Sequence, residues 1–221
     1  MTHVPQLPAG PSSQLPLRER KKQRTRRVLI DTSLELFTER GFNGVTLDEL
    51  CAAVDVSKRT FFRYFTSKED VAMAPTQDLW RAFLDTLKAC EPNSPRLWEI
   101  LQEALSSALD RMDADDWAGR VRLSRRLAAE NPSMDAHGLH FCRVTTHTAV
   151  ATLHRRFDIE TPDDLRPRLA LDMLVSAFEC ALDDWVRGPA DTSQIDLVDR
   201  FHQSCAALPH SLTLTAELRA P

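Results

Sequence analysis

The sequence lacks the features of a membrane-spanning, disulfide-bonded or catalytic protein. No apolar run in its 221 residues approaches the roughly 18–20 residues that a membrane span requires. Its five cysteines are an odd number without a C-x-x-C pair, which argues against a disulfide framework and a zinc finger and favours a reducing cytoplasm. The motifs G-x-S-x-G, G-x-G-x-x-G, H-E-x-x-H and a Walker-type loop are missing. We therefore expect a cytoplasmic protein that is not an enzyme and has no cofactor, with the cysteines as small core residues.

Glycine is also scarce, with only six in the chain, and no strand-like alternation is evident. Apolar residues recur instead with a period near 3.6, which predicts an all-α fold. The first seventeen residues contain four prolines and no charged side chain, so we predict that residues 1–17 form a disordered leader. The first helix is expected from about Lys21 to Arg40, with Gly41 ending it.

Charge is distributed unevenly along the chain. Residues 1–70 carry 12 Lys and Arg against 9 Asp and Glu, a net charge of +3, whereas the remainder carries 16 against 23, a net charge of −7. The segment RERKKQRTRR alone has seven cations and one glutamate. Such a run is often only a solvated helix face or a tail. A basic N-terminal part before an acidic remainder nevertheless suggests a polyanion as the partner of one end.

Three helix starts follow one another closely after Gly41. Thr46 begins TLDE, a capping box in which Thr46 and Glu49 each satisfy a backbone amide of the other. Ser57 is expected to cap a short helix at 58–65, and Ser67 to cap another. Helices this short are not stable alone in water, so they must pack on the first helix as one unit. Two helices joined by a short turn form the helix-turn-helix pattern, whose second helix lies in the DNA major groove.

A helix-turn-helix would explain why aromatic rings and cations are mixed in the stretch VDVSKRTFFRYFTSKED. Phe61 and Phe65, at i and i+4, are expected to form the buried side of the second helix. The opposite side is left for phosphates and base edges. It carries Lys58, Arg59, Thr60, Phe62, Arg63 and Tyr64. Lys68 is electrostatically unfavourable at a helix N-terminus, and a nearby phosphate would explain its placement.

The segments SLELFTERGFNGVT, TLDEL and VSKRTFFRYFTSKEDV, within residues 25–71, resemble the DNA-binding domain of the TetR family of bacterial transcriptional regulators. The resemblance implies an all-helical homodimer with an N-terminal three-helix reader and a larger C-terminal ligand-binding and dimerisation domain. Such proteins are mostly repressors that a small molecule releases from operator DNA. Thr46 would contact phosphate, with Ser57 capping the reading helix. By motif position, Lys58, Arg59, Thr60 and Phe62 would face the groove, and Arg63, Tyr64 and Lys68 the backbone.

One departure from the family pattern concerns Phe62, whose position is frequently tyrosine. Without the hydroxyl a phosphate bond is lost, which leaves packing or contact with a thymine methyl group. Arg59 occupies a position where a small residue is common, so we predict that it reads guanine.

The resulting domain plan places the helix-turn-helix domain at 18–67, a regulatory and dimerisation domain at 68–208 and a flexible tail at 209–221. Pro75 is expected to kink or interrupt the helix that Ser67 begins. Further helices are expected at about 95–112, 115–130, 133–157, 162–187 and 193–208. The last two are predicted to form a four-helix dimer contact. The apolar stripes of this contact would be Leu169, Met173, Ala177 and Cys180 with Ile195, Val198 and Phe201.

A ligand pocket in the second domain is predicted from its bulky side chains, although any single residue of this kind is more often plain core. The candidates are Met112, Trp117, Met134, His137, Phe141, Met173, Phe178 and Glu179. Four histidines at 137, 140, 147 and 154 lack nearby Cys or acidic partners, so no metal site is expected. Three functions remain open: a ligand-responsive repressor, a DNA-binding regulator without a ligand, and an all-α enzyme or scaffold. The SKRTFFRYF motif and the basic arm argue against the third, and nothing separates the first two.

Overall fold

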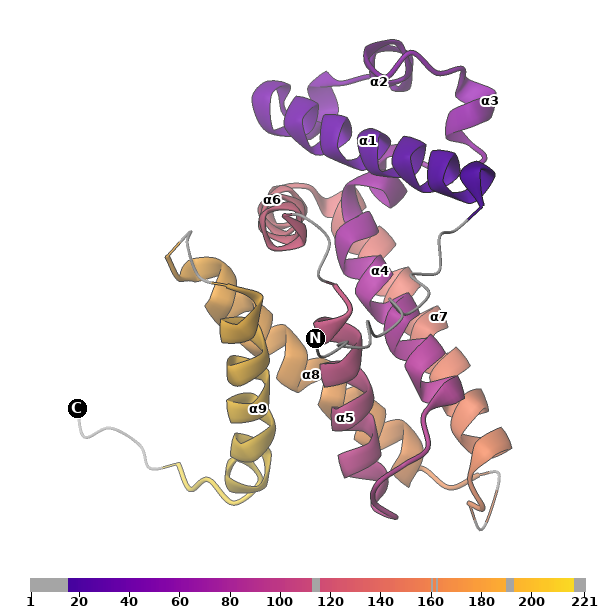
Figure 1. Cartoon of the computed structure of the whole chain (residues 1–221). Helices are drawn as coiled ribbons and strands as arrows, with labels where there is room; N and C mark the ends of the chain where they lie inside the picture. Colours follow the sequence, from indigo (N-terminus) through magenta and orange to yellow (C-terminus); the bar gives the residue numbers. More distant parts are fainter. Residues whose placement is uncertain (1–15, 113–115, 160, 162, 190–192, 217–221) are drawn as a thin grey trace, which may run out of the picture.

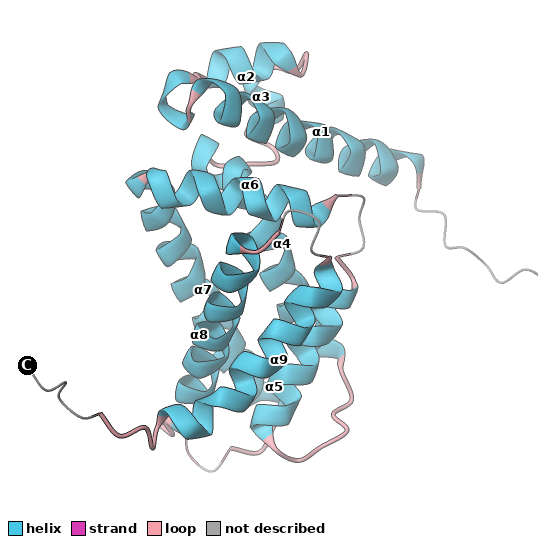
Figure 2. Ribbon diagram, turned by 90° about the vertical axis from the view of Figure 1, so that its left-hand side faces the viewer, coloured by secondary structure: helices cyan, strands magenta, loops and turns pink. Residues whose placement is uncertain are grey.

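The computed structural model describes residues 16–112, 116–159, 161, 163–189 and 193–216. Every regular element in these residues is helical, as predicted, and none is a strand. A small head of three helices lies at one end of the molecule, with α6 crossing beneath it and the other helices upright below (Figures 1 and 2). Among the described residues, no helix is long and apolar enough to cross a membrane.

The first helix, α1, spans Leu17–Arg40 and begins four residues before its predicted start. Pro16 precedes it, and the Pro16 carbonyl accepts bonds from the amides of Glu19 and Arg20. The basic run is therefore helical rather than a tail, and the predicted leader loses its last residue to α1, while residues 1–15 lie outside the described part. Gly41 ends the helix with φ of 76°, a conformation that glycine adopts without strain.

Three short elements complete the head: a 3-10 turn η1 at Phe42–Gly44, α2 at Leu47–Ala53 and α3 at Lys58–Phe61. The prediction that α3 continues to Phe65 is wrong. The chain tightens after Phe61, where the amide of Arg63 bonds to Thr60 and that of Tyr64 bonds to Phe61 in i→i+3 steps. These turns still bring Phe65 into the core beside Phe61.

α4, Lys68–Ala89, passes Pro75 as one uninterrupted helix, so the predicted break is absent. Pro75 is buried, and its carbonyl oxygen accepts a hydrogen bond of 3.0 Å from Nε1 of Trp117. The helix packs against α1, α5, α6 and α7. Burial on several sides offsets the local cost of the missing N–H and the ring clash, which is about 3 kcal/mol for an interior proline.

The remaining helices lie close to their predicted ranges. They are α5 (Leu97–Asp110), α6 (Trp117–Glu130), α7 (Pro132–Arg156), α8 (Arg166–Arg187) and α9 (Gln194–Ser211). α9 runs three residues past the expected end, through Pro209, so the predicted flexible tail begins later than 209. Residues 162 and 217–221 lie outside the described part.

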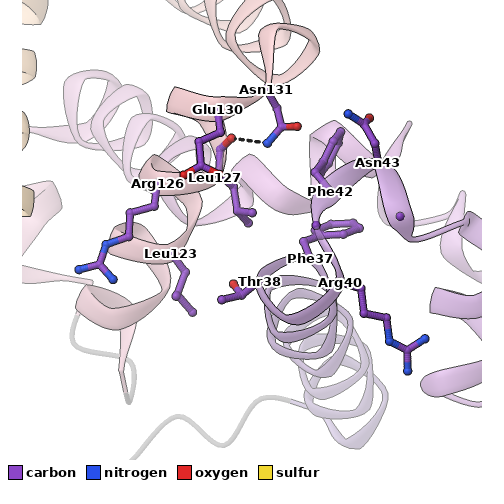
Figure 3. Close-up of a pocket in the computed structure, with 12 residues that line it drawn as sticks. Phe37, Thr38, Arg40, Phe42, Asn43, Leu123, Arg126, Leu127, Glu130 and Asn131 are labelled. Atoms are coloured by element: carbon purple, nitrogen blue, oxygen red, sulfur yellow. Dashed lines mark hydrogen bonds between the residues drawn. The ribbon is translucent and has the colours of Figure 1, made fainter.

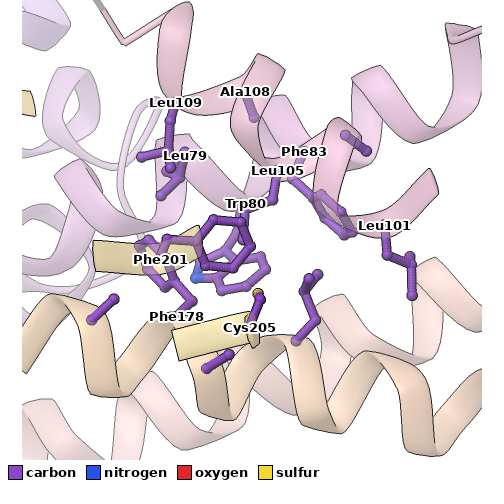
Figure 4. Packing of buried hydrophobic residues seen from close by; sticks show 14 of the residues in the cluster. Leu79, Trp80, Phe83, Leu101, Leu105, Ala108, Leu109, Phe178, Phe201 and Cys205 are labelled. Atoms are coloured by element: carbon purple, nitrogen blue, oxygen red, sulfur yellow. The ribbon is translucent and has the colours of Figure 1, made fainter. Parts of the chain in front are cut away.

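Two hydrophobic cores meet along α4. The reader core combines residues of the head with Val71–Ala74 of α4, Leu127 of α6 and Met134 of α7. The regulatory core begins at Leu79 and joins α4 to α5, α8 and α9. At its centre Trp80 and Phe178 meet edge to face, with ring centroids 5.4 Å apart, near Phe201 and Cys205 (Figure 4). Cys51 and Cys205 are buried as expected, whereas Cys180 is exposed.

Candidate nucleic-acid interface

The two caps of the head hold α2 and α3 as the sequence predicts. The Glu49 amide donates to Thr46 Oγ1 at 3.2 Å, and the Thr46 amide donates to the Glu49 carboxylate at 2.8 Å. These hydrogen bonds from Thr46 lower the pKa of Glu49, so the carboxylate stays ionised. The Thr60 amide donates to Ser57 Oγ at 3.1 Å. Both short helices are therefore fixed at their N-termini by local bonds.

α3 divides into a buried and an exposed side, as expected. Phe61 and Phe65 are 0% and 2% exposed, with ring centroids 5.7 Å apart. Phe62 is 54% exposed and meets the Phe61 ring in a T-shaped arrangement, with ring centroids 5.6 Å apart. The exposed side of α3 belongs to the end of the molecule that lies beyond α1, away from the regulatory helices (Figures 1 and 2). The aromatic pair thus anchors a four-residue helix that presents its other side to solvent.

The two cations at the start of α3 differ in their surroundings. Lys58 Nζ forms an ion pair of 2.8 Å with Asp48 of α2, and this hydrogen bond raises the pKa of Lys58. Arg59 is exposed and makes no ion pair or side-chain hydrogen bond with any described residue. Of these two, Arg59 has the guanidinium whose five donors remain available to a ligand.

Lys68 has a partner within the protein, which the sequence did not reveal. Its Nζ donates to the carbonyl oxygen of Phe42 at 3.0 Å and lies 4.4 Å from the centroid of the Phe42 ring. The cation therefore links the first turn of α4 to η1. Lys68 thus has a partner inside the protein, and its contact with a DNA phosphate stays a prediction.

A basic groove joins α3 to the start of α1, a juxtaposition that the sequence analysis missed. The guanidinium of Arg63 lies over the Tyr64 ring at 5.0 Å and donates to the Tyr64 hydroxyl at 3.2 Å. Beside them is a hollow of about 810 Å³, lined also by the first turns of α1. The signal was present in the sequence, because Arg18, Lys21, Lys22 and Thr25 recur at helical spacing in the basic run. The lining comprises Leu17, Arg18, Glu19, Lys21, Lys22, Thr25, Arg63 and Tyr64.

The eight residues predicted to line a ligand pocket are distributed over several parts of the structure, and their role in ligand binding stays a prediction. Phe178 is 1% exposed in the regulatory core, with Phe141 packed partly against the same core. Met134 is in the reader core, and Met173 is 36% exposed on α8. Among the described residues, Met112 and Trp117 line the same cavity, a cleft of about 240 Å³ between α1, α4 and α6.

The two polar members of that set have partners of their own. His137 Nε2 lies 3.1 Å from Gln77 Nε2 and 3.6 Å from an Asp70 carboxylate oxygen. Glu179 forms an ion pair of 2.9 Å with Arg125, and burial raises the pKa of Glu179. Within the described ranges, no group of three or more His, Cys, Asp or Glu is placed to hold a metal ion.

Two further cavities among the described residues differ greatly in size. The void between α4, α7 and α8, lined by Trp80, Phe83 and Cys142 among others, has a volume of only about 10 Å³. A hollow of about 530 Å³ lies between the C-terminal end of α1, η1 and α6 (Figure 3). Arg126 points away from the Phe37 and Phe42 rings, and Asn131 Nδ2 donates to the Leu127 carbonyl at 2.7 Å (Figure 3). This hollow lies between the head and α6, beside the place where Leu127 of α6 packs into the reader core.

Comparison with known proteins agrees with the reader geometry. Residues 29–74 match the family described as bacterial regulatory proteins, tetR family. Over 182 residues the chain is 30% identical to the HTH-type transcriptional regulator TcmR of Streptomyces glaucescens, covering 80% of this chain and 78% of that protein. The chain belongs to the TetR family. TetR-family proteins are transcription regulators rather than enzymes, which confirms that expectation from the sequence.

Two further similarities extend over most of the chain. The protein named "Putative mycofactocin biosynthesis transcriptional regulator MftR", of Mycobacterium tuberculosis, is 26% identical over 170 residues, which is 76% of this chain and 83% of MftR. A crystal structure of a TetR-family protein from Syntrophomonas wolfei superposes with a TM-score of 0.54 at 14% identity, covering 85% of this chain and 95% of that one. The latter supports the fold, with its N-terminal helix-turn-helix and helical C-terminal part.

Proposed function

We propose that this TetR-family protein is a cytoplasmic repressor that binds operator DNA as a two-fold dimer and is released by a small molecule. The observation that carries the DNA-binding role is the exposed side of α3, where Arg59 is free among the described residues and Phe62 is 54% exposed. An arginine of this kind binds guanine O6 and N7, and an apolar ring contacts a thymine methyl group. We assign the remaining phosphate and groove contacts to Thr46, Ser57, Lys58, Thr60, Arg63, Tyr64 and Lys68.

The role of a repressor is supported by shorter similarities. The chain is 33% identical over 88 residues to the HTH-type transcriptional repressor NemR of Escherichia coli, which covers 40% of this chain and 39% of NemR. These matched residues are less than half of either protein. The similarity therefore supports repression rather than activation by analogy alone. The proposal of DNA binding rests on the α3 surface.

The dimer is proposed from an exposed apolar row on α8. Leu165, Leu169 and Met173 recur every four residues and are 72%, 56% and 36% exposed. Ile195 of α9 is 73% exposed. Ala177 and Phe201, predicted from the sequence as interface residues, are instead 3% and 0% exposed inside the protomer. A smaller set of apolar side chains on α8 and α9 is thus available for a partner, and two-fold pairing would give two readers for a near-palindromic site.

Selection from a random duplex library tests the DNA-binding role. The full-length protein should enrich a near-palindrome whose half-sites lie about one helical turn, 34–36 Å, apart. Arg59→Ala with Phe62→Ala should abolish enrichment, whereas the tail variant Leu214→Lys should enrich the same site. If selection with the wild-type protein enriches no particular DNA sequence, the proposed reading function is wrong.

A regulator without a ligand is a second candidate, because the interior beside α4 is so well filled. A void of about 10 Å³ is at the lower limit for a single water molecule. A ligand must therefore use an open cleft or separate the helices. A thermal-shift screen with apolar and amphipathic compounds distinguishes these two functions, since only a ligand-responsive protein is stabilised.

A further inference from the structure

We propose that the basic groove between the start of α1 and the turn after α3 binds the phosphodiester backbone of the DNA that flanks each half-site. The groove is the hollow of about 810 Å³ that Arg63 and Tyr64 share with the first turns of α1. Because these two residues lie just after α3, the groove continues the surface assigned to the half-site. This inference deepens the proposed DNA binding and rests on it.

The α1 wall of the groove precedes the part of the chain that matches the family. The match begins at residue 29, whereas α1 begins at Leu17. Residues 17–28 therefore add about 18 Å of helix, at 1.5 Å per residue. This end of α1 projects beyond α2, α3 and α6 (Figure 2). At 3.4 Å per base pair, its length corresponds to about five base pairs of duplex.

The cations of the groove are available to an anion. Arg18 and Lys21 are exposed, and neither side chain makes an ion pair or hydrogen bond with a described residue. Arg63 is also exposed, and it donates to the neutral hydroxyl of Tyr64 rather than to a carboxylate. Guanidinium and ammonium groups of this kind bind phosphate through charge-assisted hydrogen bonds.

Acidic residues at the groove are few. Among the described residues of its lining, Glu19 is the one with a carboxylate, and that carboxylate lies 3.8 Å from Lys22 Nζ. The residues before Leu17 contain no Asp or Glu. The part of the chain that directly precedes the groove therefore adds no carboxylate to it.

Residues 113–115, which include two aspartates, join the described chain at a different side of α1. Met112 and Trp117 flank that segment, and both line the cleft that also contains Gln23 and Arg27. With 3.6 residues per turn, these two positions of α1 point nearly opposite to those of the groove. The cations of the groove are thus argued from their own surroundings, without the cleft.

A duplex fits this surface better than a membrane does. A helix that lies on a membrane needs a continuous apolar side. In the described lining of the groove, Leu17 is the one aliphatic side chain, and it stands among cations. Phosphates spaced along a DNA backbone match such a wall, and contacts to them increase affinity without reading bases.

The experiment uses the site enriched by library selection, placed in two duplexes. The short duplex ends about two base pairs beyond the half-sites, and the long one carries about ten further base pairs of unrelated sequence on each side, more than the reach of α1. In fluorescence anisotropy the full-length protein should bind the long duplex at least about ten-fold more tightly, and the slope of log affinity against log salt should steepen by about 0.9 for each added phosphate contact.

Two double variants locate this gain in affinity. Arg18→Gln with Lys21→Gln should remove most of it. Arg20→Gln with Arg24→Gln is the matched control, because it removes two exposed cations from the same turns of α1 that do not line the groove, and it should keep the gain. Glutamine is nearly as good a helix former as arginine and lysine, so α1 should persist in both variants.

Two results with DNA would overturn the groove contact. They are no gain from the flanks, and an equal loss of the gain in both double variants. A third result would assign the groove to a membrane surface instead. It is binding to vesicles of phosphatidylcholine and phosphatidylglycerol that the Arg18 and Lys21 variant alone loses, without any gain from the flanks.

The library selection separates this inference from the proposed function. A protein that enriches a site but gains nothing from the flanks keeps its reading function and loses the groove contact. A protein that enriches no sequence loses the reading function. The groove contact then stands if the Arg18 and Lys21 variant binds an unrelated duplex more weakly than the control variant does, and it falls if the two bind alike.

Discussion

Trp117, the first residue of α6, donates its indole N–H to the carbonyl oxygen of Pro75 in α4 across 3.0 Å. The bond is buried and joins residues 42 positions apart. It lies where α4 leaves the reader core and enters the regulatory core. The contact therefore fixes the position of α6 against the helix that both cores share.

Trp117→Phe tests the strength of this bond. The substitution keeps an aromatic ring but leaves the buried Pro75 carbonyl without this donor, so we expect a loss of about 1–3 kcal/mol in the free energy of unfolding. Urea denaturation measures it. Trp98→Phe, at a partly buried tryptophan of α5, is the control and should cost less. Equal losses would mean that ring size rather than the hydrogen bond matters.

Arg59→Ala and Arg63→Ala should have different effects on DNA binding. Loss of a bidentate guanine contact removes about 1–3 kcal/mol of discrimination, so Arg59→Ala should relax one base position per half-site. Arg63 lies beside the basic groove of α1. Arg63→Ala should therefore weaken binding to all DNA sequences alike and reduce the slope of affinity against salt. Library selection and salt titrations measure the two effects. An unchanged preferred sequence for Arg59→Ala would assign base reading to another residue.

Lys68→Ala is a less clean test of a phosphate contact than the sequence suggested. The variant also removes the bond between Lys68 Nζ and the Phe42 carbonyl, which is 3.0 Å long. We expect it to weaken binding to all duplexes and also to lower stability. Lys68→Met, which keeps the apolar stem, should show the same stability loss if the carbonyl bond is its cause. Unfolding curves recorded without DNA separate the two effects.

Thr46→Ala removes the capping box of α2. Loss of such a cap typically costs about 1 kcal/mol, and Thr46→Ser should restore most of it because the serine hydroxyl accepts the same Glu49 amide. The capping bonds also lower the pKa of Glu49, so their stabilisation is present above the unfolded pKa and is lost as pH falls through the folded one. Unfolding at neutral and acidic pH should therefore show a smaller difference between wild type and Thr46→Ala in acid.

Glu179→Gln should change the pH dependence of stability in the opposite direction. Burial raises the pKa of Glu179 above its ordinary value of 4.5, although Arg125 opposes this. Stability from the protonated carboxyl is complete below the unfolded pKa and is lost as pH rises through the folded pKa. The stability of wild type minus that of Glu179→Gln should thus decrease from pH 4 upward across this window. A difference that increases over the same window would show that the Arg125 pair dominates.

Leu169→Lys combined with Met173→Lys tests the proposed dimer. Two lysines on the exposed row of α8 would place like charges across a two-fold contact, which should shift the protein to monomer in light scattering. Leu214→Lys, at a residue 81% exposed beyond α9, is the control for adding a cation and should leave the dimer intact. A dimer that persists in the double variant would locate the contact elsewhere.

The sequence predicts best where the signal is local. The caps at Thr46 and Ser57 involve residues three positions apart, and Phe61 and Phe65 lie four apart. A short window of sequence is therefore sufficient to predict them. The unbroken α4 depends instead on packing by four other helices, which no window around Pro75 contains. The positions of the predicted pocket residues also depend on distant packing, because a Met or Phe at helical spacing has the same sequence pattern whether its neighbours leave a cavity or fill it.

The sharing of α4 between two cores bears on how the chain folds. Val71–Ala74 complete the interior of the head, and Leu79 to Leu87 form part of the regulatory interior. A fragment cut at 67 would leave the inner surface of the head open to water, together with the sites that Leu127 and Met134 fill. Amide hydrogens of α4 should consequently exchange only when both parts open together. The head is therefore a cooperative folding unit that includes Val71–Ala74, although these residues belong to a helix of the regulatory part.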